Sequence, residues 1–172
     1  MKKLSYIGAV LLSLTFGLAV YTLSYSQENK TAQKEPATAN HAAGPFEVKM
    51  TPQKPDNPVE EAAQFSRMTS DKQFHGDLEA TSKGEMLATG DPKSSAVYVA
   101  LERVTGTLKG RSGSFVLHHT GIMNRGVPQL SIGVVPDSGT GQLAGIAGKM
   151  MINIAKDGKH SYDFEYTLPE AQ

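Results

Sequence analysis

Three side chains have the chemistry for proton transfer if the fold encloses them: Glu102, His119 and Glu79. Alternate residues of a β-strand point to the same side, so Glu102 shares a face with Tyr98 and Ala100. A carboxylate enclosed on that face would have a raised pKa and could act as a general acid or base. A cross-strand ion pair or a solvent-exposed position is the more ordinary interpretation of the same residue, and both remain open.

Two adjacent histidines, His118 and His119, must point to opposite faces of any strand that contains them. His119 falls on the same face as Phe115 and Leu117. We therefore expect His119 to be buried and hydrogen-bonded, or to contact a ligand. The predicted ligand-binding residues are Tyr98, Phe115, Leu117 and His119.

Glu79 lies in a polar row with His75, Asp77 and Thr81, which is typical of the solvated face of a strand. Glu79 could take part in chemistry only if the interior were polar at that point. The histidines show no spacing typical of metal ligands, and the chain contains no cysteine. We expect neither a metal site nor a cofactor.

The elements that would position these side chains are short alternating segments separated by glycine and proline. In the last of them Tyr162, Phe164 and Tyr166 share one face, which predicts one buried and one polar side. Residues 76–88 form either one long strand or a hairpin that turns at 82–84. The expected strand segments are 46–50, 65–74, 76–88, 95–105, 113–121, 129–135, 148–155 and 160–168. This pattern predicts an all-β fold, a closed antiparallel β-barrel of about eight strands.

The glycine-rich segment 137–148 superficially matches a nucleotide-binding loop. Such loops need a βαβ context, or a Gly-Lys-Ser/Thr ending, and neither is present. A turn and bulge at a barrel corner is the better interpretation.

The N-terminus has the pattern of an export signal. The basic start Met1-Lys2-Lys3 precedes a mostly apolar run, and the small residues Ser24 and Ser26 fit the −3 and −1 positions of a cleavage site after Ser26. We expect a signal peptide at 1–26 and an exported protein, periplasmic or secreted. The alternative is an uncleaved anchor, because about 20 apolar residues can span a bilayer.

Residues 27–44 are small and polar, which predicts a flexible, disordered linker before a barrel domain at 45–172. The whole chain has 17 basic and 17 acidic residues, so removing Lys2 and Lys3 leaves a slight acidic excess. No basic patch interleaved with aromatic residues is present, which argues against nucleic acid as a partner. Membrane contact is expected only through an uncleaved N-terminus.

Three segments carry a resemblance to a known family: 74–82, 98–121 and 138–148, the last with the pattern Gly-Thr-Gly-x-Leu-x-Gly-x-x-Gly. They resemble an uncharacterised bacterial family, a domain of unknown function whose members look like allene oxide cyclase-type barrels. The glycine pattern is also similar to one in plant dirigent proteins. The resemblance implies a closed barrel, assembly as a homo-oligomer and a lumen for hydrophobic molecules, and it transfers no catalytic residue to this chain.

Three functions follow as hypotheses. The first is a binding protein that holds a small hydrophobic or amphipathic molecule in the barrel lumen. The second is an isomerase or cyclase that uses a lumenal carboxylate or histidine. The third is a structural envelope protein, and we expect the contents of the lumen to discriminate among them.

Overall fold

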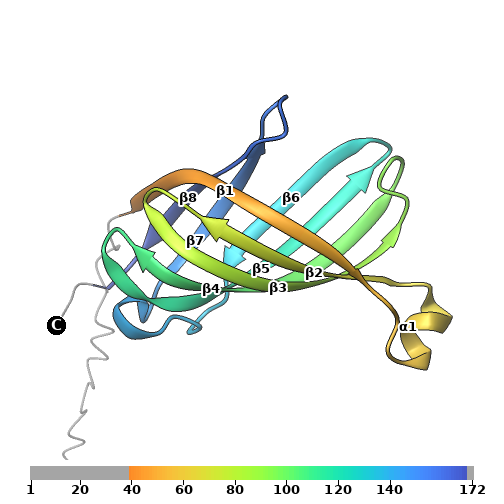
Figure 1. The fold of residues 1–172 in the computed structure, drawn as a ribbon, viewed down its shortest axis with the longest axis horizontal. Helices are drawn as coiled ribbons and strands as arrows, with labels where there is room; N and C mark the ends of the chain where they lie inside the picture. Colours follow the sequence, from red (N-terminus) through yellow and green to blue (C-terminus); the bar gives the residue numbers. More distant parts are fainter. Residues whose placement is uncertain (1–38, 170–172) are drawn as a thin grey trace, which may run out of the picture. The chain divides into compact units, whose positions relative to one another are not determined.

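A computed structural model of the protein describes residues 39–169, which form one closed antiparallel barrel of eight strands (Figure 1). The predicted signal peptide and residues 27–38 of the predicted linker lie outside the described residues. The strands are β1 (Asn40–Gln53), β2 (Ser66–Phe74), β3 (Leu78–Gly90), β4 (Ala96–Leu108), β5 (Arg111–Asn124), β6 (Val127–Val134), β7 (Ala147–Ile154) and β8 (His160–Thr167). The all-β barrel predicted from the alternation is confirmed.

The strands follow one another around the barrel in chain order, and β1 pairs with β8 to close it. Two-residue turns join several neighbours. Lys109 and Gly110 between β4 and β5 have φ of 47° and 81°, and Arg125 and Gly126 between β5 and β6 have φ of 50° and 82°. Positive φ at both central residues matches the twist of the paired strands, so these turns fix the register of their hairpins.

Strand β3 resolves the choice left open for residues 76–88. It runs without a break from Leu78 to Gly90, and Gly84 lies in its interior opposite Glu102 of β4. A Cβ at Gly84 would come within 2.6 Å of Ser70 Oγ on β2. Glycine is therefore needed for close packing at this position and does not mark a turn.

Strand β1 begins earlier than expected, at Asn40, which corrects the predicted end of the linker at residue 44. Residues 40–44 pair with β8, and Ala42 is fully buried. Backbone pairing along β8 requires no large side chain, so a small and polar composition concealed this part of the strand.

The interior differs between the two ends of the barrel. We call the end beside the β4–β5 turn the closed half and the end beside α1 (Pro58–Ala63) the open half (Figure 1). The closed half is filled by buried, mostly aromatic and branched side chains: Phe74, Leu78, Leu108, Phe115, Leu117, Leu143, Phe164 and Tyr166. The inward side chains of the open half are Met50, Met86, Tyr98, Ala100, Leu130, Ile152 and Ile154.

The connection between β6 and β7 seals the closed half. It contains one short 3-10 turn, η1 (Gly141–Leu143), and no long helix, so the glycine-rich segment is a barrel corner. The Thr140 backbone N–H donates to the Ser114 carbonyl at 2.8 Å, and Leu143 is buried beside Gly113. A Cβ on Gly113 would lie 2.1 Å from the Thr140 carbonyl oxygen, so this glycine lets the connection fold against β5.

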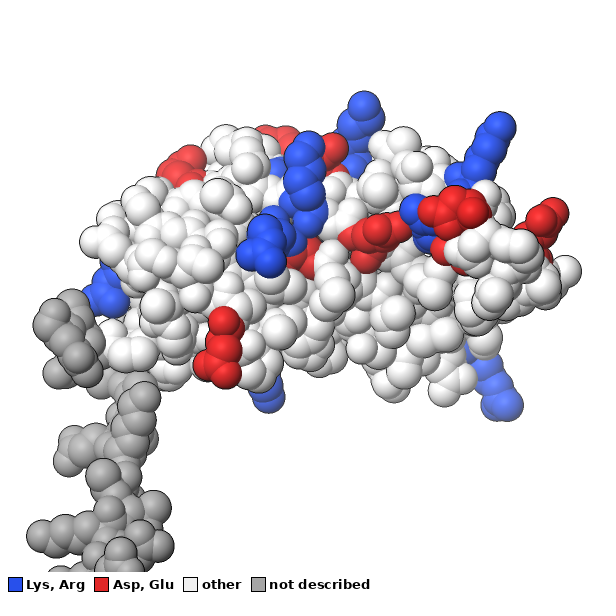
Figure 2. Space-filling model, turned by 90° about the horizontal axis from the view of Figure 1, so that it is seen from below, with Lys and Arg blue, Asp and Glu red and all other residues white. Residues whose placement is uncertain are grey.

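On the face in Figure 2, positive and negative side chains intermingle and no broad area of one sign forms. Within residues 39–169, no helix is both long and apolar enough to cross a membrane.

Candidate functional site

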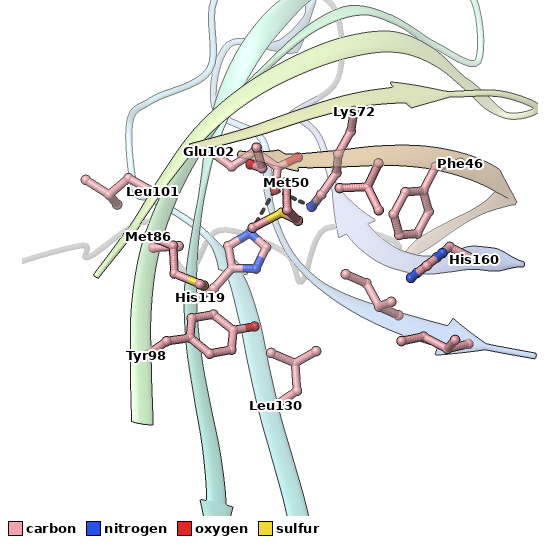
Figure 3. Close-up of a pocket in the computed structure, with 15 residues that line it drawn as sticks. Phe46, Met50, Lys72, Met86, Tyr98, Leu101, Glu102, His119, Leu130 and His160 are labelled. Atoms are coloured by element: carbon pink, nitrogen blue, oxygen red, sulfur yellow. Dashed lines mark hydrogen bonds and ion pairs between the residues drawn. The ribbon is translucent and has the colours of Figure 1, made fainter. Parts of the chain in front are cut away.

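A pocket of about 250 Å³ occupies the open half of the barrel (Figure 3). Its wall is mostly apolar, and a small set of polar side chains lies at its inner end. The lining residues are Phe46, Val48, Met50, Ser70, Lys72, Met86, Tyr98, Ala100, Leu101, Glu102, His119, Leu130, Ile152, Ile154 and His160.

Glu102 is the centre of the polar set, and its side chain is only 2 % exposed. Lys72 Nζ lies 2.6 Å from Glu102 Oε2, and the Ser82 hydroxyl donates to Oε1 at 2.5 Å. His119 Nε2 is 3.0 Å from Oε2. Four neighbouring strands, β2 to β5, thus each supply one member of a connected cluster. We call Lys72, Ser82, Glu102 and His119 the Glu102 cluster.

The partners of Glu102 determine its ionisation. Burial alone would raise its pKa, but His119, the Lys72 ammonium and Ser82 outweigh burial and lower the pKa from 4.5 to about 2. The expectation of a raised pKa is therefore wrong. The causes are His119 and the Lys72 cation, both on other strands, and Glu102 is a carboxylate at neutral pH.

The contact between His119 and Glu102 is short but poorly directed. Nε2 and Oε2 are 3.0 Å apart, yet the ring N–H does not align with the oxygen as in a full hydrogen bond. A separation of 3.0 Å leaves no room for another atom between them. We therefore take the carboxylate as the partner of Nε2.

Lys72 is nearly as enclosed as the group it pairs with, because its side chain is 9 % exposed. Its ammonium also lies 5.5 Å from the ring centre of Phe46 and 5.8 Å from that of Phe74. Aromatic faces attract cations, so the two rings and the carboxylate together compensate the buried charge.

Tyr98 forms one wall of the pocket beside His119 (Figure 3). Its place depends on Gly121 of β5, because a Cβ there would lie 2.0 Å from the Tyr98 ring. Burial, followed by the charge of Glu102, raises the pKa of the Tyr98 phenol. The hydroxyl is therefore protonated at neutral pH and can donate or accept a hydrogen bond.

The structure separates the residues singled out from the sequence. Tyr98, Glu102 and His119 lie together in the pocket. Phe115 and Leu117 share the inward face of β5 with His119, but both are fully buried in the packed closed half and do not line the pocket.

Glu79 does not face the lumen. Its side chain is 57 % exposed and accepts a hydrogen bond from the Gly76 backbone N–H at 2.8 Å. Glu79 was a catalytic candidate only if its side chain pointed into a polar interior. Because it points to solvent, it is not part of the site. Among residues 39–169, no three histidine, cysteine or carboxylate side chains are grouped so as to hold a metal ion.

Sequence reasoning missed Lys72 and Ser82. Both were within reach of the alternation rule, because Lys72 is two residues from the buried Phe74 and Ser82 is two residues from the buried Ala80. Weak alternation over 65–74 concealed the inward phase of β2.

A closed β-barrel with one packed half, one hollow half and a buried polar cluster between them defines the class of this protein. The chain belongs to the family described as "Protein of unknown function (DUF3224)", whose sequence model matches residues 42–166. It is similar to a DUF3224 protein of unknown function from Shewanella oneidensis MR-1, for which a crystal structure exists, with 44% sequence identity and a TM-score of 0.69. That similarity covers 78% of this chain and 100% of the other. No curated protein matches the chain.

Proposed function

We propose that this protein binds a small, mostly apolar molecule in the open half of its barrel. The observation that carries the proposal is the contrast inside one barrel. The closed half is filled by fully buried side chains, whereas the open half retains a pocket of about 250 Å³. Natural interiors are close-packed, so a lined space of this size calls for an explanation.

The composition of the pocket wall supports a ligand. Binding sites combine apolar walls with a few placed polar groups, and typical volumes run from about 300 to 1,000 Å³. This pocket is slightly smaller than that range, and the Glu102 cluster supplies the polar groups at its inner end. We therefore expect a compact ligand of about the size of a substituted benzene ring.

The ionisation of Glu102 favours binding over an enzyme of the isomerase or cyclase type. A carboxylate whose pKa is about 2 holds no proton to donate at neutral pH and is a weak base. Its oxygens are also engaged by Lys72, Ser82 and His119. Glu102 is thus better suited to hold the side chains of Lys72, Ser82 and His119 in position than to transfer a proton.

The test is to fill the pocket. Ala100 faces the pocket from β4, and Val99 beside it faces outward and is 52% exposed. The variant Ala100→Phe should abolish the fluorescence that N-phenylnaphthylamine gains on binding the full chain, while the matched control Val99→Phe should leave it unchanged. Equal dye binding by both variants and the wild type would place the dye outside the lumen and reject the proposal.

Native mass spectrometry of protein purified from its own host provides an independent measurement. We expect a small retained molecule that Ala100→Phe excludes and Val99→Phe keeps. From the N-terminal pattern we also propose that binding occurs outside the cytoplasm, which cell fractionation and N-terminal sequencing of the exported protein would test.

A further inference from the structure

The two ring nitrogens of His119 differ in their polar partners. Nε2 faces Glu102, while Nδ1 makes no hydrogen bond or ion pair within residues 39–169. The residue is only 6 % exposed, and its ring projects into the pocket (Figure 3). Of the two nitrogens Nε2 is fully enclosed, whereas Nδ1 keeps some exposure, so a molecule in the pocket can reach Nδ1 and hydrogen-bond to it.

The charges around His119 indicate which form of the ring is present. Glu102 and Lys72 carry opposite charges that cancel, so a neutral imidazole keeps the whole buried cluster neutral. A neutral imidazole has one N–H, and Nε2 must hold it because Nε2 faces a carboxylate. Nδ1 is then a lone-pair acceptor.

We propose that the ligand is a hydroxylated apolar molecule, such as a substituted phenol or a cyclic alcohol, whose O–H donates to Nδ1 of His119. This inference rests on the proposed binding function and names the chemical class of the ligand. Tyr98 fits the same class of ligand. The Tyr98 hydroxyl projects into the same space and can donate to the ligand oxygen (Figure 3).

A carboxylate ligand suits the site poorly. It carries no proton for Nδ1, and the cation it would seek, Lys72, is already paired with Glu102 at 2.6 Å and flanked by two aromatic rings. Bringing a second anion beside Glu102 would add like-charge repulsion in a buried place. The pocket therefore selects a neutral hydrogen-bond donor.

Calorimetric titration of the full chain with three matched probes tests the inference: para-butylphenol, para-butylanisole and para-butylbenzoate. The phenol and its methyl ether have nearly the same shape, but only the phenol can donate. Losing a hydrogen bond to a buried acceptor should weaken binding about tenfold, so we expect the phenol to bind tightest and the benzoate weakest.

Two variants separate the role of the ring nitrogen from that of the pocket shape. His119→Leu should bind phenol and ether with equal affinity, because the acceptor is gone. His118→Leu, the neighbouring outward position, should keep the tenfold preference. A retained preference in His119→Leu would overturn the assignment of the acceptor.

Nitrogen NMR of labelled histidine in the wild type keeps the test independent of any variant's folding. We expect a protonated Nε2 and an unprotonated Nδ1 for His119 at neutral pH, and a shift of Nδ1 when the phenol is added. A protonated Nδ1, equal binding of phenol and ether, or tighter binding of the benzoate would each overturn the inference. Binding of none of the probes would reject the proposed function itself, and this inference with it.

Discussion

The closed and open halves of the barrel are built from the same eight strands, yet their interiors differ in kind. In the closed half, Phe115 stacks on Phe164 with ring centres 5.7 Å apart, and Phe164 stacks on Tyr166 at 5.2 Å. In the open half, inward residues such as Leu130 and Ile154 remain 46% and 66% exposed. The difference shows that stability can be concentrated at one end of a small barrel, which leaves the other end free for a site.

The largest expected effect comes from truncating a closed-half aromatic side chain. Phe115 is fully buried, so Phe115→Ala should destabilise the protein by about 3 to 5 kcal/mol, through lost burial and a new cavity. Met86, which lines the pocket, is only partly buried, and Met86→Ala should cost no more than about 1 kcal/mol. Urea unfolding of both variants measures the difference, and equal costs would show that the two halves are packed alike.

The next effect concerns the layer between the halves. The pKa of Glu102 falls from 4.5 to about 2 on folding, so its ionisation stabilises the native state above pH 4.5, by about 3 kcal/mol. This contribution is lost as the pH falls from 4.5 towards 2, where the carboxyl group becomes protonated in the folded protein as well. Glu102→Gln should therefore be about 3 kcal/mol less stable than the wild type at pH 7, and the gap should narrow below pH 4.5 and nearly close at about pH 2.

A matched control is Glu165→Gln, which lies outward on β8 in an exposed position. Its unfolding free energy should stay within about 0.5 kcal/mol of the wild type across the same pH range. If Glu102→Gln also tracks the wild type at every pH, the contacts of the Glu102 cluster do not stabilise the ionised carboxylate.

Alternation in the sequence was sufficient to predict the barrel and the apolar, buried faces of β5 and β8. It placed Tyr98 and Glu102 on one face of β4 and His119 on the apolar face of β5, but left open whether the face of β4 points inward; the structure brings these three together. It failed for β2, where the weak pattern left Lys72 unassigned. Because Lys72 is 30 residues from Glu102 along the chain, the lowered pKa of Glu102 could not be derived without the three-dimensional arrangement.

Depth along the barrel axis was the second quantity that alternation could not supply. Phe115, Leu117 and His119 share one face, so all three were expected to contact a ligand. Which of them meets the pocket depends on the stagger of the strands and on Leu143 and the rest of the β6–β7 connection, which close only one end. The stagger of the strands and the position of the β6–β7 connection are long-range properties of the fold. The boundary between the packed and the hollow half follows from them.

A smaller effect tests how the closed half is sealed. Thr140 Oγ1 accepts from the Ser114 backbone N–H at 3.0 Å and lies 2.8 Å from the Ser114 hydroxyl. Thr140→Val keeps the shape and removes both contacts, which should lower the unfolding free energy by about 1 kcal/mol. Thr140→Ser keeps the hydroxyl and should recover most of this stability. A loss in Thr140→Val no larger than that in Thr140→Ser would show that these hydrogen bonds do not hold the connection in place.

The smallest effect is expected at the open end, in α1. Asn57 caps this helix by accepting from the backbone N–H groups of Val59 and Glu60 at 3.1 and 3.0 Å, and the helix has no buried residue. Asn57→Ala should weaken the helix locally by about 1 kcal/mol, seen as faster amide hydrogen exchange at Glu61 and its neighbours. Global unfolding should change by less than about 0.5 kcal/mol, because a segment that buries nothing opens without the barrel. A loss of global unfolding free energy as large as the local one would mean that α1 unfolds together with the barrel. The β1–β2 connection would then close the open half, as the β6–β7 connection closes the other.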